Sequence, residues 1–167
     1  MLRLNEEEGS PLYGKIDPAR IGIAGFSQGG AAALRAASVL DCAGKFCTVA
    51  AVSPSYEERA AGFGWGYDPA RITVPVLLLA GTKGNEENGQ ITSLEEQRKT
   101  FGALGGPKAA ARKTGVTHND IRLESLGCLT AWMAWRLCGD ETAAGMFVGD
   151  APELALNEGW QDVRLEL

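Results

Sequence analysis

One serine of this chain stands in a setting that could make it a nucleophile. Residues 25–29 read Gly-Phe-Ser-Gln-Gly, a G-x-S-x-G pattern that follows a short apolar run and precedes an alanine-rich stretch. That order predicts a strand, a sharp turn and a helix, so the Ser27 hydroxyl would be held exposed at the strand end. Gly25 and Gly29 are expected where strand and helix pack too closely for side chains. The backbone N–H of Gln28 would lie at a helix N-terminus and could donate to a developing oxyanion.

The partner for such a serine is limited to one residue. His118 is the only histidine of the chain, so serine–histidine chemistry within one subunit must use it. It stands between a predicted strand at residues 108–113 and a predicted helix that begins near Asn119. A lone histidine is often a surface or structural residue, and a serine in a glycine-rich turn can be incidental. A loop position after a strand, downstream of Ser27, favours the role of general base.

The residues around this serine and histidine resemble those of the α/β-hydrolase superfamily, in particular bacterial hydrolases of the dienelactone-hydrolase, chlorophyllase and polyester-hydrolase type. The likeness spans most of residues 14–148. Besides the serine motif, it rests on Ser53-Pro54, residues 74–81 (Val-Pro-Val-Leu-Leu-Leu-Ala-Gly), residues 117–120 (Thr-His-Asn-Asp), Thr130-Ala131-Trp132 and Gly139-Asp140. Phe26 stands where many relatives have histidine. That position lies outside the triad, so the difference is expected to alter the pocket lining more than the mechanism.

The resemblance places the acid of a Ser–acid–His triad shortly after the strand expected at residues 74–80, where relatives commonly carry aspartate. Residues 81–91 contain no aspartate, so a glutamate would have to serve. Glu87 is the first choice and Glu86 the second, although acidic residues in a loop rich in glycine and asparagine are often only solvated. Asp120 is closer to the histidine along the chain, but its surroundings predict a helix N-cap.

Strands and helices alternate along the chain, which predicts an α/β fold with a mostly parallel sheet of about four strands and helices on both faces. The expected strands cover residues 20–24, 45–52, 74–80 and 108–113, and the expected helices cover residues 28–40, 94–104, 121–137 and 141–147. One domain is expected over residues 1–167, with a run-in segment at 1–19, a sheet core at 20–138 and a helical tail at 139–167.

Composition argues against several classes of function. Of 167 residues, 45% are hydrophobic and 22% are charged, as in ordinary globular domains. A net charge of −5 argues against nucleic-acid binding. No apolar run approaches the ~20 residues of a membrane span, and the acidic N-terminus lacks a signal-peptide core, so a cytoplasmic protein without membrane contact is expected. Four cysteines without a C-x-x-C pattern predict reduced, packed thiols, with a Cys42–Cys47 bridge as the alternative, and no metal or cofactor motif is visible.

The expected sheet begins with the strand that carries the serine, whereas in α/β-hydrolases that strand lies in the middle of a larger sheet. The resemblance therefore predicts a truncated α/β-hydrolase core: a fragment, a subunit of an assembly or a shortened homologue. An apolar, uncovered edge at residues 20–24 would be unfavourable, so we expect a homodimer or a partner chain that covers it. The family's second oxyanion donor comes from a loop after an earlier strand, and this sequence offers no source for it.

Two functions are compatible with these residues. The first is a serine hydrolase for a small-molecule ester or related acyl compound, with Ser27 as nucleophile and His118 as general base. Glu87 or Glu86 would orient the histidine, and Gln28 N–H would donate to the oxyanion. The second is a catalytically weak or inactive α/β-hydrolase remnant that acts as a subunit or binding module.

Overall fold

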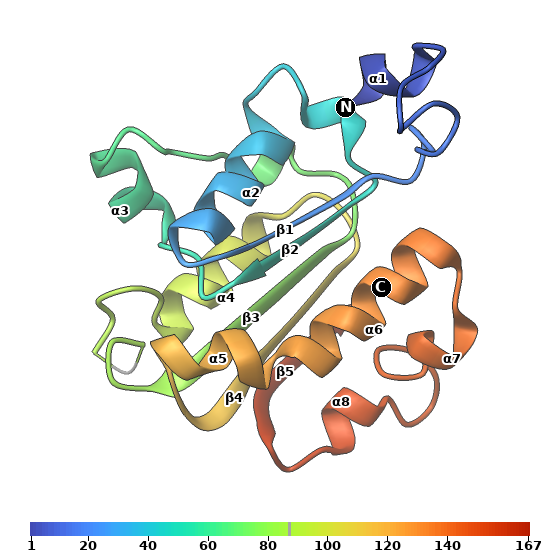
Figure 1. The fold of residues 1–167 in the computed structure, drawn as a ribbon. Helices are drawn as coiled ribbons and strands as arrows, with labels where there is room; N and C mark the ends of the chain where they lie inside the picture. Colours follow the sequence, from blue (N-terminus) through green and yellow to red (C-terminus); the bar gives the residue numbers. More distant parts are fainter. Residues whose placement is uncertain (87) are drawn as a thin grey trace.

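A computed structural model describes residues 1–86 and 88–167 and contains a five-stranded sheet in the order β1-β2-β3-β4-β5 (Figure 1). Four strands run parallel: β1 (Gly22–Phe26), β2 (Thr48–Val52), β3 (Val76–Lys83) and β4 (Lys108–Thr117). The last strand, β5 (Trp160–Glu166), pairs antiparallel with β4. The predicted α/β fold with a mostly parallel sheet is thereby confirmed.

The fifth strand corrects the expectation of a shorter sheet followed by a helical tail. The helices α7 (Glu141–Ala144) and α8 (Glu153–Leu156) are short, and the chain then returns to the sheet as β5. Asp162 has a φ of 55°, and the register between β4 and β5 shifts beside it. This irregularity breaks the alternation of inward and outward side chains by which a strand is recognised in a sequence.

Helices cover both faces of the sheet, as predicted. Figure 1 shows α2 (Gln28–Ser38), α3 (Glu57–Gly62) and α4 (Leu94–Ala103) on one face, and α6 (Leu126–Cys138) with α7 and α8 on the other. Three consecutive leucines at 77–79 of β3 are each at most 1% exposed and enter the two cores alternately. A strand buried on both faces appears in the sequence as a continuous apolar run, which is why β3 was predicted so clearly.

The helix expected at residues 121–137 is two helices that meet at Ser125. The first, α5 (His118–Glu124), carries the histidine at its start, and α6 follows after the bend. Both β1 and β4 also extend further toward their carboxyl ends than expected, to Phe26 and Thr117. Each strand therefore ends directly before a residue of the candidate site.

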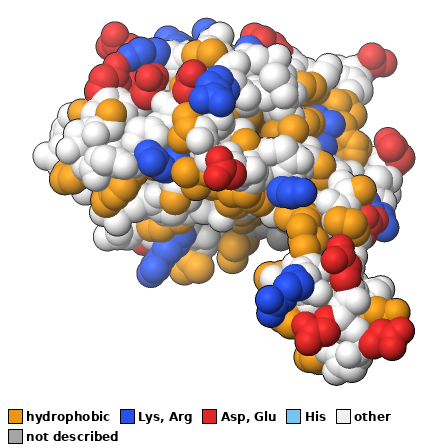
Figure 2. Space-filling view, turned by 90° about the horizontal axis from the view of Figure 1, so that it is seen from above, with side chains coloured by type: hydrophobic (Ala, Val, Ile, Leu, Met, Phe, Trp, Pro, Cys, Tyr) orange, Lys and Arg blue, Asp and Glu red, His pale blue; other side chains and the backbone are white. Residues whose placement is uncertain are grey.

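The N-terminal segment leaves the edge of β1 uncovered. The helix α1 (Leu2–Glu6) buries no residue, and Figure 1 places it beyond the amino end of β1. Figure 2 shows a small lobe that projects from the body on that side. In the described part of the chain no other strand pairs with the free edge of β1. Two 3-10 turns, η1 (Ala43–Lys45) and η2 (Pro69–Arg71), complete the connections.

None of the helices described is both long enough and apolar enough to cross a membrane.

Candidate active site

Ser27 lies in a sharp turn between β1 and α2. Its backbone has φ 56° and ψ −120°, a conformation that costs a non-glycine residue about 1–3 kcal/mol and is concentrated at functional sites. The turn is held by Ser27 N–H, which donates to Val52 O at the end of β2 over 2.9 Å. Because α2 begins at the next residue, Gln28, the serine is presented at the carboxyl edge of the sheet.

Two glycines allow strand and helix to approach, but they are not the pair expected from the motif. A Cβ on Gly25 would lie 2.0 Å from Gly29 O, so no side chain fits at residue 25. A Cβ on Gly29 would meet nothing within 4 Å, so the packing reason predicted for that glycine is wrong. Gly30 is the second tight position, where a Cβ would lie 3.1 Å from Pro54. Gly30 and not Gly29 is the tight position because successive residues of a helix point in different directions. Gly30 faces the end of β2 and is buried, whereas Gly29 is exposed.

A chain of two hydrogen bonds joins three side chains from different parts of the sequence. His118 Nε2 lies 2.9 Å from Ser27 Oγ, and His118 Nδ1 lies 2.8 Å from Glu86 Oε1. The histidine side chain is 12% exposed and that of Glu86 is 0% exposed. Since a carboxylate can only accept, Nδ1 carries the ring proton and Nε2 is left to accept from the serine hydroxyl. Ser27 and His118 therefore lie within hydrogen-bond distance of each other.

Glu86, the second choice for the acid, lies at the histidine. Glu87, the first choice, lies outside the described residues. Glu86 lies in the turn after β3, and its second oxygen, Oε2, accepts from Thr92 N at 3.2 Å. The Thr92 hydroxyl in turn donates to Pro54 O at 2.7 Å. Thr92 was not found from the sequence, because nothing in the residues themselves indicates which backbone group meets the carboxylate.

Asp120, the other acidic residue considered, forms its side-chain hydrogen bond with Thr117 and none with the histidine. Its carboxylate accepts from the Thr117 hydroxyl at 2.6 Å. The sequence predicted Asp120 as the N-cap, but the N-cap of α5 is Thr117, three residues earlier, and Asp120 stands in the first turn of the helix. The acidic side chain near the start of the helix still complements the positive end of its dipole.

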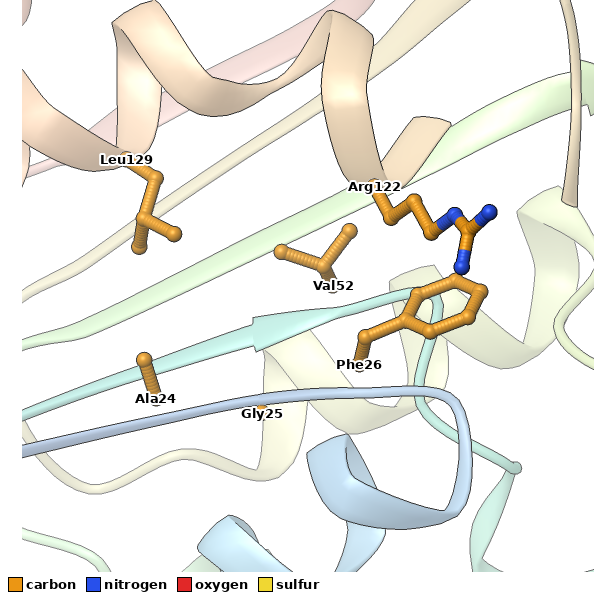
Figure 3. Close-up of a pocket in the computed structure, with 6 residues that line it drawn as sticks. All are labelled: Ala24, Gly25, Phe26, Val52, Arg122 and Leu129. Atoms are coloured by element: carbon orange, nitrogen blue, oxygen red, sulfur yellow. The ribbon is translucent and has the colours of Figure 1, made fainter. Parts of the chain in front are cut away.

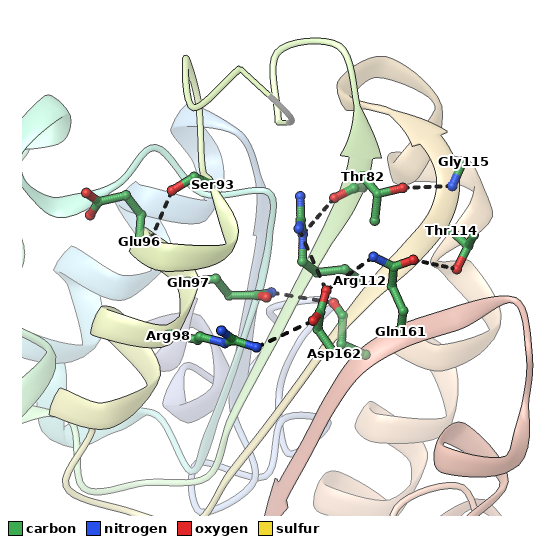
Figure 4. Close-up of polar contacts among 12 residues, drawn as sticks. Thr82, Ser93, Glu96, Gln97, Arg98, Arg112, Thr114, Gly115, Gln161 and Asp162 are labelled. Carbon is green, nitrogen blue, oxygen red and sulfur yellow. Dashed lines mark hydrogen bonds and ion pairs between the residues drawn. The ribbon is translucent and has the colours of Figure 1, made fainter.

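The carboxyl ends of β3 and β4 are fastened together, which brings the loop of Glu86 to the histidine. A Cβ on Gly81 would lie 2.3 Å from a backbone oxygen of β4, so the two strands approach closely there. Gly115 N donates to Thr82 Oγ1 at 2.7 Å, and Arg112 Nε donates to Gly81 O at 3.0 Å (Figure 4). The buried Arg112 also lies 3.7 Å from the carboxylate of Asp162, so β5 helps to hold the site in place.

Phe26 contributes a contact that the motif does not reveal. Its ring packs against the imidazole of His118, with 4.7 Å between centroids and 31° between planes. The imidazole is therefore held at its edges by two hydrogen bonds and on one face by an apolar ring. The only sequence signal was the position of Phe26 directly before Ser27.

Two hollows lie beside these residues. An apolar groove of about 210 Å³ runs between β1 and α6 (Figure 3) and is lined by Ala24, Gly25, Phe26, Val52, Arg122 and Leu129. A second hollow of about 250 Å³ lies on the side of the Glu86 loop and is lined by Gly84, Asn85, Thr117, His118 and Asn119.

The first backbone N–H of α2 has no acceptor within its helix. Gln28 is the first residue of α2, and at that position no helical carbonyl can accept from its N–H.

The end of the neighbouring strand β2 resembles the serine turn. Ser53 has φ 41°, is fully buried and donates its N–H to Leu79 O at 2.6 Å. The Ser53 hydroxyl has no hydrogen-bond partner among the described residues.

No group of three or more His, Cys, Asp or Glu side chains in the described residues could hold a metal ion.

All four cysteines are free: Cys42, Cys47, Cys128 and Cys138. Burial raises the pKa of the Cys128 thiol to about 12. Cys138 is exposed, which corrects the expectation that every thiol is packed.

A scan against models of protein families and a search of curated proteins found no match to this chain.

Proposed function

We propose that this protein is a serine hydrolase that cleaves a small carboxylic ester or related acyl compound through an acyl-enzyme intermediate on Ser27. The observation that carries the proposal is the hydrogen-bonded chain from Ser27 Oγ through the His118 ring to the Glu86 carboxylate, with contacts of 2.9 and 2.8 Å. A line of hydroxyl, imidazole and carboxylate is the arrangement that activates a serine. The strained turn under the serine adds support.

In the proposed reaction, Ser27 Oγ attacks the carbonyl carbon while its proton passes to His118 Nε2. Glu86 accepts from Nδ1–H, so it fixes the ring tautomer and stabilises the imidazolium that forms. The N–H of Gln28 donates to the oxyanion of the tetrahedral intermediate. The alcohol leaves with the proton from Nε2. A water molecule, deprotonated by the same nitrogen, then attacks the acyl carbon; the bond from that carbon to Ser27 Oγ breaks, the acid is released, and the proton on Nε2 returns to Oγ.

The proposal includes an α/β-hydrolase core. Its support is the order of the sheet: the serine follows β1, the acid follows β3 and the histidine follows β4. Because these strands are parallel, all three side chains meet at one edge of the sheet. The order Ser–acid–His along the chain is the one that the superfamily uses.

Labelling with a fluorophosphonate probe tests the proposal without knowledge of the substrate, because the probe reacts with activated serines. We expect one adduct per chain, located on Ser27 by peptide mass spectrometry, and none in Ser27→Ala. His118→Ala should lower the labelling rate by about 10³ or more, since members of a triad act as a unit. Urea-unfolded protein is the control and should not be labelled. A folded protein that takes up no label would refute the proposal.

The second candidate is a non-catalytic α/β-hydrolase-like module that binds a partner. Two observations favour it: the edge of β1 is unpaired in the described part of the chain, and Gln28 N–H is the one oxyanion donor that we identify there. Loss of one such donor typically costs about 10²–10³ in kcat. The same labelling experiment decides between the candidates, because a module without an activated serine would not react.

A further inference from the structure

We propose that Ser53 is a positioning residue of the active site, whose hydroxyl oxygen faces the Cε1–H edge of the His118 ring and stabilises that ring when it carries a positive charge. The inference rests on the proposed function and deepens it, because it names a further residue on which the proton transfer depends. It is supported by the place of Ser53 in the sheet, by its backbone conformation and by its unpaired hydroxyl.

Ser53 lies at the end of the strand that the triad crosses. The last residues of β1 and β2 are paired, so Ser27 and Ser53 follow equivalent positions of neighbouring strands. Glu86 belongs to the turn after β3, on the other side of β2. Because the His118 ring connects Ser27 with Glu86, it bridges the end of β2. Ser53 is the residue at that end.

The segment of Ser53 is also fastened to both ends of the triad. On one side, Ser27 N–H donates to the carbonyl of the residue before Ser53 at 2.9 Å. On the other side, Thr92 N–H donates to Glu86 Oε2 at 3.2 Å. The Thr92 hydroxyl then donates to the carbonyl of the residue after Ser53 at 2.7 Å. The position of Ser53 relative to the triad is therefore fixed from both sides.

The geometry of the imidazole decides which of its edges faces this position. Nε2 is directed at Ser27 Oγ and Nδ1 is directed at Glu86 Oε1. Cε1 is the ring carbon bonded to both nitrogens, so its C–H bond points into the space between Ser27 and Glu86. That space lies over the end of β2. The Cε1 hydrogen is the most positive C–H hydrogen of the ring, and protonation of the ring makes it more positive.

The hydroxyl of Ser53 is buried without an ordinary hydrogen bond. Ser53 is 0% exposed, and its Oγ has no partner among the described residues. Its φ of 41° is a second unfavourable feature, since non-glycine residues avoid this region. Unpaired buried groups and strained backbone are uncommon and concentrate at functional sites. An oxygen that faces a C–H group has no ordinary hydrogen bond, as is observed for Ser53.

The contact gains importance during the reaction. His118 becomes an imidazolium when it takes the proton of Ser27, and its side chain is only 12% exposed, so little water is available to stabilise the charge. The Ser53 oxygen supplies the negative end of a fixed dipole at the ring edge. A C–H···O contact is weak between neutral groups and roughly doubles in strength when one partner is charged. We therefore expect this hydroxyl to accelerate the reaction about fivefold to tenfold.

Removal of the hydroxyl tests this role. Ser53→Ala should lower kcat for p-nitrophenyl hexanoate about fivefold to tenfold and leave KM within about twofold, because the effect falls on the proton transfer. Ser125→Ala is the matched control and should leave both constants within about twofold. Ser125 also has a buried hydroxyl without a partner among the described residues, but it lies where α5 meets α6.

A second variant separates activity from stability. Ser53→Gly also lacks the hydroxyl, but glycine accepts the positive φ at this position. It should therefore raise the melting temperature and show the same loss of kcat as Ser53→Ala, a combination that misfolding does not produce. Wild-type kcat in both variants would overturn the inference.

The ring itself can be observed, because His118 is the only histidine of the chain and gives one set of NMR signals in tag-free protein with isotope-labelled histidine. Loss of an oxygen that stabilises the charged ring favours the neutral ring. The midpoint of the His118 titration should therefore fall by about 0.7–1 pH unit in Ser53→Ala, since tenfold corresponds to one unit. It should not move in Ser125→Ala. The described charged groups near the ring stay the same in both variants: Glu86, Asp120 and Arg122.

The Cε1–H signal reports the contact directly. An oxygen that faces this hydrogen deshields it, so the signal should move upfield in Ser53→Ala. The Cδ2–H signal, from another edge of the same ring, should move less and is the internal control. Equal movement of the two signals would overturn the inference, because it would indicate a general rearrangement of the ring.

These measurements separate failure of the inference from failure of the proposed function. Fluorophosphonate labelling of Ser27, together with a titration midpoint and a Cε1–H signal that Ser53→Ala does not move, would overturn the inference and leave the hydrolase intact. A wild-type protein that takes up no label would refute the hydrolase, and a shifted midpoint would still support the contact between Ser53 and His118. An equal shift in Ser125→Ala would overturn the inference, because loss of any buried hydroxyl would then disturb the ring.

Discussion

Replacing Glu86 by glutamine is the sharpest test of the proposed triad, because the side chain keeps its shape while its hydrogen-bonding pattern changes. Glu86 is fully buried and accepts two hydrogen bonds, from His118 Nδ1 and from Thr92 N. The two donors face different oxygens of the carboxylate, and a glutamine amide has an oxygen at only one of these two positions, so it cannot accept from both. If its oxygen keeps the bond to Thr92 N, the NH₂ group faces Nδ1 and forces the imidazole proton onto Nε2. The histidine can then no longer take the proton of Ser27.

The expected loss follows from that tautomer change. In a serine protease triad the equivalent change from carboxylate to amide lowers kcat by about 10⁴. If the glutamine oxygen turned to Nδ1 instead, the buried Thr92 N–H would be left unpaired at about 1–3 kcal/mol, which opposes that arrangement. We therefore expect Glu86→Gln to lower kcat by about 10³–10⁴, which corresponds to ~4–5.5 kcal/mol of transition-state stabilisation.

The assay is the rate of p-nitrophenol release from p-nitrophenyl hexanoate, together with the rate of fluorophosphonate labelling. Glu87→Gln, one residue further along the chain, is the matched control and should stay within about twofold of the wild type. Circular dichroism and the melting temperature would establish that both variants are folded. A loss of less than about tenfold in Glu86→Gln, or a larger loss in Glu87→Gln, would refute the assignment of Glu86.

Three other outcomes are expected. Gly25→Ala should prevent folding or destabilise the protein by several kcal/mol, because its Cβ would lie 2.0 Å from Gly29 O. Thermal melts should show the control Gly29→Ala as neutral or stabilising by about 0.5–1 kcal/mol. Equal losses of stability in the two variants would contradict the packing argument. Iodoacetamide at about pH 8 should alkylate exposed Cys138 and spare Cys128, because the thiolate is the reactive form and burial raises the pKa of the Cys128 thiol to about 12. Peptide mass spectrometry measures the alkylation of each cysteine. Equal alkylation rates at the two cysteines would contradict this prediction and mean that α6 opens readily. Light scattering across a dilution series should give the mass of a homodimer, because the free edge of β1 favours pairing with a second chain, and a monomer at every concentration would contradict this.

Much of the fold could be predicted because its signals are local. The leucine run of β3 is hydrophobic on both faces and appears as such in the sequence. The glycine-flanked serine between an apolar run and an alanine-rich stretch predicts its own turn. The fifth strand was missed because Asp162, with its positive φ, interrupts the alternation that would have indicated it. Its pairing with β4 is a contact between segments far apart in the chain, and no local pattern records it.

By itself, the sequence singled out the serine and the histidine that the structure brings together: one serine in a strand–turn–helix context and one histidine downstream. These follow from residue type and local order. Only the tertiary structure decided that Glu86 meets the histidine, that Gly30 is the second glycine required by packing, and that Phe26 packs on the imidazole. The physical reason is common to all three. Adjacent residues in a turn or helix point in different directions, so which one reaches a partner depends on the path of the backbone, and that path is set by contacts such as those that fasten β3 to β4.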